Sequence, residues 1–165
     1  MISYKDIGGN MNIFVLDHSP KTSAEMMCDK HVVKMILETA QMLCTVAHTQ
    51  GFKAPYKATH KNHPCTLWAA KTKQNWDWLI IHGLALCVEY TKRYGKVHKS
   101  MQHIEWCKSL DIKLPTKGLL PFAQAMPVQY KNKCAVKAYR AYYKGEKASF
   151  AKWKNGNIPN WWLTD

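Results

Sequence analysis

The sequence predicts an all-α protein, built as a single compact domain of long antiparallel helices with an irregular aromatic C-terminal tail. Three observations predict this class. Two long stretches, 20–49 and 64–94, carry apolar residues at helical spacing. Each stretch begins at a helix-capping signal and ends at a glycine. The 165 residues are 47% hydrophobic and contain no internal repeat or linker, which suits one domain with a substantial core.

The first elements are indicated by local signals. Residues 13–16 are a short apolar segment, expected to be a strand or extended chain. Ser19 as N-cap and Pro20 in the first turn predict a helix that runs from about 20 to 49 and is closed by Gly51. A polar loop should then occupy 50–63 and lead into the second long helix.

The second long helix is expected from about 64 to 94, where Gly95 stops it, and a shorter helix near 98–109. Turn-forming residues then predict a loop: Pro115, Gly118 and Pro121. Residues 122–126 are predicted to form a brief helical turn. A last helix should span 133–143 and extend to about Trp153, and the tail from Gly156 should be irregular.

The net charge of +13 indicates a polyanionic partner, most simply nucleic acid. The 24 basic residues include only two arginines, Arg93 and Arg140. Lysine acts on phosphate as a point charge, whereas arginine can read bases with two hydrogen bonds. We therefore expect binding to the nucleic-acid backbone with little sequence specificity. The alternative is a basic surface with no partner.

The six cysteines, at 28, 44, 65, 87, 107 and 134, include no CxxC pair and lie mostly among apolar residues. We interpret them as reduced core residues of a cytoplasmic protein. The sequence shows no signal peptide and no apolar run long enough to span a membrane, so we expect no membrane partner.

The first ten residues differ from the rest of the chain. Residues 1–10 are polar, whereas Met11 opens the apolar segment. We hypothesise that translation naturally begins at Met11. Residues 1–10 would then be a non-native or flexible extension, and 11–165 the helical domain.

The first long helix carries the most informative pattern, between Asp29 and Glu38. His31, Lys34 and Glu38 fall within about 60° of one another on a helix. They supply the imidazole, amine and carboxylate that an acid/base or Schiff-base site needs. The opposite face is expected to pack: Val32, Val33, Ile36, Leu37, Ala40, Leu43 and Cys44.

Two details favour chemistry over a solvated polar face with a Lys34–Glu38 ion pair. Met27 and Met35 flank this face, and the partial burial that they indicate would raise the pKa of the Glu38 carboxyl. Asp29 lies on the packed side and needs a partner there, so we assign it a structural role.

Two further groups are candidates for binding. His60-x-x-His63-Pro-Cys65 resembles part of a zinc site, which Asp17, His18 or His31 would have to complete. Alternatively, His63 caps the second helix and His60 faces solvent or phosphate. We expect neither a metal nor a cofactor.

Lysines interleaved with aromatic residues suit phosphate and unpaired bases. The predicted nucleic-acid-binding set is Lys30, His60, Lys61, His63, Lys131, Lys133, Lys137, Arg140, Lys144, Trp161 and Trp162. The alternative is that the aromatic residues pack in the hydrophobic core: Tyr139, Tyr142, Tyr143 and the two tryptophans.

The step Asp29-x-His31-Val32, with Glu38 seven residues after the histidine, resembles the phage-type pyrimidine-dimer DNA glycosylases, also called endonuclease V. The segments 62–65 and 121–127 resemble uncharacterised phage relatives. The resemblance implies a small, basic, all-α DNA repair enzyme that acts on double-stranded DNA without a metal. We expect a monomer in the cytoplasm, which is that of the host cell if a phage encodes it.

The resemblance also implies a mechanism. These enzymes are glycosylases with abasic-site lyase activity: an amine attacks C1′ of the damaged nucleoside and forms a Schiff base. The amine is that of the mature N-terminus, here that of Met11, with Lys34 as a substitute. Glu38 would stabilise the sugar cation and move protons, and His31 would position substrate or phosphate. The family has arginines where Leu37 and Gln41 stand here.

Two other functions fit the residues. One is a metal-dependent nuclease or phosphohydrolase, with ligands drawn from Asp17, His18, Asp29, His31, Glu38, His60 and His63. The other is a nucleic-acid-binding module without catalysis, which would be indifferent to the loss of the Glu38 carboxyl.

Overall fold

The computed structural model describes residues 11–155 and 157–164, so the extension predicted for residues 1–10 lies outside the described residues. Within the described ranges the chain is helical and contains no strand, which confirms the all-α class. The helices are α1 (Pro20–Met26), α2 (Asp29–Thr49), α3 (Pro64–Lys71), α4 (Lys73–Tyr94), α5 (Met101–Lys108) and α6 (Ala135–Glu146), with short 3₁₀ turns η1 (Val128–Tyr130) and η2 (Asn160–Trp162).

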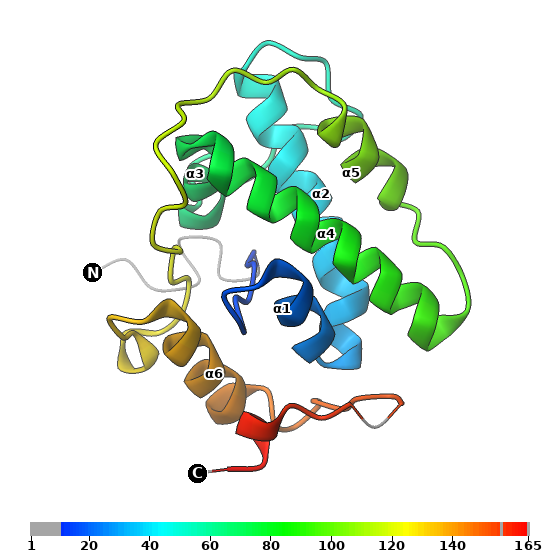
Figure 1. The fold of residues 1–165 in the computed structure, drawn as a ribbon, viewed down its shortest axis with the longest axis vertical. Coiled ribbons are helices and arrows are strands. Elements are labelled where there is room, and N and C mark those ends of the chain that lie inside the picture. Colours follow the sequence, from blue (N-terminus) through cyan, green and yellow to red (C-terminus); the bar gives the residue numbers. More distant parts are fainter. Residues whose placement is uncertain (1–10, 156, 165) are drawn as a thin grey trace.

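The two long helices, α2 and α4, cross with opposite directions at the centre of the molecule, as Figure 1 shows. Helix α4 packs against α1, α2, α3 and α5. Helix α6 and the C-terminal segment lie at the other end of the molecule, beside α1 (Figure 1).

The single helix predicted over 20–49 is wrong, because the chain is extended at Met27 and Cys28 and so separates α1 from α2. No glycine or proline marks this break. The guanidinium of Arg93 on α4 stabilises it by donating to the carbonyls of Met27 (2.7 Å) and Glu25 (3.0 Å). Carbonyls at a helix C-terminus need such partners, and here a distant residue supplies them.

The second long helix is also divided, at Thr72. Thr72 is the N-cap of α4: its hydroxyl accepts the Asn75 N–H (3.0 Å) and donates to the carbonyl of Gly118 (2.9 Å). The Lys73 N–H donates to the carbonyl of Pro115 (2.9 Å). The 115–118 segment therefore fixes a break that helical periodicity alone does not reveal.

Several predicted ends are confirmed by their capping contacts. Ser19 accepts the Thr22 N–H at 3.2 Å, and Gly95 ends α4 with a positive φ of 71°. Two predictions are wrong: residues 122–126 form no helical turn, and the last helix ends at Glu146 rather than near Trp153.

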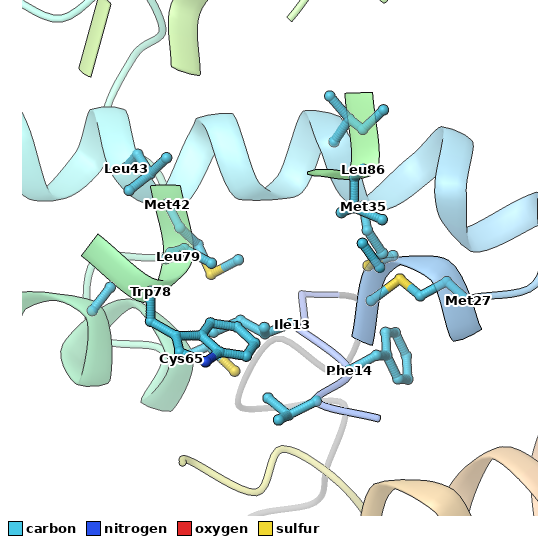
Figure 2. Close-up of a cluster of buried hydrophobic side chains, with 14 of the residues drawn as sticks. Ile13, Phe14, Met27, Met35, Met42, Leu43, Cys65, Trp78, Leu79 and Leu86 are labelled. Carbon is cyan, nitrogen blue, oxygen red and sulfur yellow. The ribbon is translucent and has the colours of Figure 1, made fainter. Parts of the chain in front are cut away.

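The buried N-terminal segment 11–16 passes through the centre of the core without helix or strand, and Phe14 within it has a positive φ of 56°. Figure 2 shows Phe14 of this segment near Met27, the residue that follows α1, and below Met35 of α2. Leu79 and Leu86 of α4, with Trp78 and Cys65, extend the same cluster (Figure 2). The core thus forms around the segment that begins at Met11.

All six cysteines are free thiols, five of them buried, as the sequence predicts. Among the described residues, no helix is both long and apolar enough to cross a membrane.

Candidate active site

A cavity of about 220 Å³ opens beside the middle of α2. Its lining residues come from three segments: Met11 from the N-terminal segment, Lys34, Leu37, Glu38 and Gln41 from α2, and His60 from the 50–63 loop. The structure therefore brings together three residues that the sequence predicts as catalytic, Met11, Lys34 and Glu38, with one predicted to bind nucleic acid.

The Glu38 carboxyl is buried, with 5% of the residue exposed. Its Oε1 accepts the backbone N–H of Asn12 at 2.9 Å. Its Oε2 is also buried and accepts no hydrogen bond from the described part of the chain. One oxygen is thus fixed against the N-terminal segment, and the other is available to a group that enters the cavity.

Burial raises the pKa of Glu38 from its ordinary value of 4.5 to about 7, since a buried carboxylate loses its hydration. The Asn12 N–H and the Lys34 ammonium oppose this rise, because both favour the ionised form. Near neutral pH both protonation states of Glu38 are therefore populated, as a general acid/base requires.

Lys34 stands at the rim of the cavity rather than inside it. Its Nζ lies 3.8 Å from Glu38 Oε2, while 51% of its side chain is exposed. The ammonium thus remains hydrated while it contacts the carboxylate.

Asn12 is the residue that the sequence analysis missed. It is completely buried, its side-chain amide donates to the carbonyl of Ala125 (2.7 Å), and its Oδ1 accepts the backbone N–H groups of Ile13 and Phe14. A polar residue within an apolar segment was the one signal in the sequence, because a buried amide needs several partners. Asn12 positions the start of the segment against Glu38.

His31 does not line the cavity. It is 4% exposed, its Nδ1 lies 2.7 Å from the Tyr143 hydroxyl, and its ring stacks on Phe14 at 4.3 Å. Burial lowers its pKa to about 3, and the nearby Lys147, Lys34 and Lys30 add to the effect. His31 is therefore a neutral imidazole at neutral pH.

The buried and exposed faces of α2 differ from those predicted from helical spacing. Val33 and Leu37, expected to pack, are 38% and 40% exposed, whereas His31 and Glu38 are buried. The N-terminal segment and α6 cover the polar face, so that face contributes to the core. Asp29 meets the partner it requires in Arg93, at 3.1 Å.

The predicted nucleic-acid-binding residues are dispersed. Lys30, His60, Lys61, Lys131, Lys133 and Lys137 are exposed. Lys131 and Lys133 line a surface depression of about 680 Å³ with Phe122 and Gln124. His63 is buried and caps α3 by accepting the Cys65 N–H at 3.0 Å.

The remaining members lie beside α6. Arg140 donates to the carbonyl of Leu16 (2.8 Å) and pairs with Asp17 (3.1 Å). Lys144 donates to the carbonyl of Thr164. Trp161 and Trp162 are half-buried against Tyr143, with ring centroids 6.0 and 6.4 Å away, so the tail docks onto the core.

No group of three or more histidine, cysteine, aspartate or glutamate side chains in 11–155 and 157–164 is arranged to hold a metal ion. The residues considered for a metal-dependent nuclease do not converge. Asp17 pairs with Arg140, Asp29 pairs with Arg93, and His63 caps a helix.

The model of the pyrimidine dimer DNA glycosylase family matches residues 11–103, more than half of the chain. The matched region begins at Met11 and contains Asn12, Glu38 and His60. No curated protein and no solved structure gives a significant match. Membership implies a DNA substrate and a role in DNA repair. The chain belongs to the pyrimidine dimer DNA glycosylase family.

Proposed function

We propose that this protein excises pyrimidine-dimer-type lesions from double-stranded DNA and then cleaves the strand at the resulting abasic site, through a Schiff base. Glu38 is the acid/base group, and the α-amine of a chain that begins at Met11 is the nucleophile. The observation that carries the proposal is the buried Glu38 carboxyl, whose pKa is about 7, hydrogen-bonded at 2.9 Å to the backbone nitrogen next to Met11.

The N-terminal amine suits this chemistry better than Lys34 does. An α-amine has a pKa near 7.7–8.0, so a useful fraction is neutral at physiological pH. The Lys34 side chain is 51% exposed and its Nζ lies 3.8 Å from Glu38 Oε2, so it stands at the rim as an ion-pair partner of the carboxylate. If Met11 is removed, the α-amine of Asn12 takes the position of the nitrogen that already contacts Glu38.

The reaction then divides between two groups. The amine attacks C1′ as the damaged base leaves, while ionised Glu38 stabilises the positive charge that develops on the sugar. Glu38 subsequently takes the C2′ proton, which leads to cleavage of the strand. Exposed lysines around the cavity hold the flanking phosphates, in keeping with the net charge of +13. We propose that the protein acts as a monomer.

Borohydride reduction traps such a Schiff base as a stable protein–DNA adduct. We expect an adduct with ultraviolet-irradiated duplex DNA from protein that begins at Met11. Glu38→Gln should reduce its formation at least about 100-fold, as expected for loss of a general acid/base. Glu105→Gln is the matched control, because Glu105 is an exposed glutamate on α5, away from the cavity.

Two results would overturn the proposal. One is the absence of an adduct on irradiated or abasic DNA with binding intact, which would leave a binding module without catalysis. The other is loss of activity in chelator, since the proposed chemistry uses no metal.

A further inference from the structure

His60 stands at the mouth of the active-site cavity with a backbone conformation that is uncommon outside glycine. Its φ is +48°, in the left-handed region, where a side chain other than glycine is strained. The imidazole is exposed and makes no hydrogen bond or ion pair with the described part of the chain. It nevertheless lines the same cavity as Glu38 and Lys34.

The chain on both sides of His60 is held tightly. The completely buried hydroxyl of Thr45 accepts the Thr59 N–H (3.0 Å) and shares its proton between the carbonyls of Gln41 (2.8 Å) and Thr59 (3.0 Å). On the other side, the His63 N–H donates to the His60 carbonyl at 3.0 Å. These contacts fix the backbone of His60 relative to α2, so its side chain projects from a fixed point beside the cavity that Glu38 also lines.

An exposed side chain at the mouth meets a different part of the DNA than Glu38 does. The buried Glu38 carboxyl faces the sugar that enters the cavity. Under the proposed function the phosphates remain at the rim, where Lys34 is exposed. An imidazole is the side chain best suited to give up a proton near neutral pH. An exposed imidazole at this cavity is therefore suited to protonate a phosphate that leaves the sugar.

We infer that His60 is a catalytic residue of the lyase step and protonates the phosphate that departs from C3′. This inference rests on the proposed function. Ionised Glu38 removes the C2′ proton from the Schiff base, and the electron pair of that bond forms the enamine. The enamine electrons then form the C2′=C3′ double bond and restore the iminium as the C3′–O bond breaks; the electrons of that bond remain on the phosphate oxygen, to which the His60 imidazolium donates its proton. The imidazole takes a proton from water afterwards.

The test measures Schiff-base formation and strand cleavage separately, on duplex DNA with one abasic site, with protein in excess. His60→Asn is the informative variant, because asparagine tolerates a positive φ but cannot act as an acid. We expect the ratio of cleavage rate to adduct-formation rate to fall about 100-fold, so that adduct accumulates. Lys57→Gln, which removes an exposed cation from the same loop, should leave this ratio within about 3-fold of the original.

His60→Gly supplies a second measurement. Glycine fits the positive φ without strain and leaves space for a small molecule. Added imidazole should restore cleavage in this variant and have no effect on His60→Asn at the same concentration. The inference is overturned if both variants keep the original ratio, or if imidazole restores nothing to His60→Gly. If the unsubstituted protein itself gives no adduct, the result contradicts the proposed function rather than the role of His60.

Discussion

The ionised Glu38 carboxylate should destabilise the folded protein at neutral and alkaline pH. Replacing Glu38 should show how much free energy of unfolding is lost. The folded protein raises the pKa of Glu38 from 4.5 to about 7, so the unfolded chain releases this proton at a lower pH than the folded chain does. Between these two values the unfolded state binds fewer protons, and stability therefore falls as pH rises. The rise in pKa corresponds to about 3 kcal/mol, lost progressively from about pH 4.5 to 7 and constant above.

Glu38→Gln removes this titration and keeps an oxygen that can accept the Asn12 N–H. At pH 4 both side chains are neutral, and the free energies of unfolding should agree within about 1 kcal/mol. At pH 8 the variant should be more stable by about 3 kcal/mol, although it is inactive. Urea unfolding monitored by circular dichroism across pH 4–9 measures the difference. A difference that stays constant with pH would refute the reasoning, because it would mean that Glu38 titrates normally.

Three other changes test the fold and the DNA-binding surface. Arg93→Met removes the buried guanidinium that pairs with the buried Glu89 and the half-buried Asp29, and leaves Glu89 only the exposed Lys92. It should destabilise the protein by about 3–5 kcal/mol in urea unfolding, and a loss below about 1 kcal/mol would contradict this. Gly83→Ala places a methyl group 2.8 Å from Thr39 Cγ2 and should lower the free energy of unfolding by about 1–3 kcal/mol. An unchanged melting temperature would contradict this. Leu37→Arg puts a cation at the cavity mouth and should increase the salt dependence of DNA binding by about one released counterion. DNA titrations at several salt concentrations measure this as the slope of log K against log salt concentration. The same slope as that of the unsubstituted protein would show that DNA does not reach this position.

The sequence predicted the helices well and their interruptions poorly. Capping residues such as Ser19 and Gly95 act locally, so their effect is readable from neighbours in the chain. The breaks at Met27–Cys28 and at Thr72 depend on Arg93 and on the 115–118 segment, which are distant in sequence. Periodicity carries no information about such partners.

The candidate site shows the same division. Spacing on one helix placed Glu38 and Lys34 on a common face, and the flanking methionines indicated burial. The same spacing placed His31 with them, although in the structure Phe14 and Tyr143 cover it. Asn12 and the position of His60 were not predictable from helix geometry, because both depend on how the N-terminal segment and the 50–63 loop pack against α2.

The most direct test of the central claim is the identity of the amine that binds DNA. Protein that begins at Met11 is incubated with abasic duplex DNA, reduced with borohydride and digested, and the modified peptide is sequenced by mass spectrometry. We expect the DNA remnant on the α-amine of the N-terminal peptide, and we expect Lys34→Met to keep this adduct. A remnant on Lys34, or an N-terminal peptide that carries none, would contradict it.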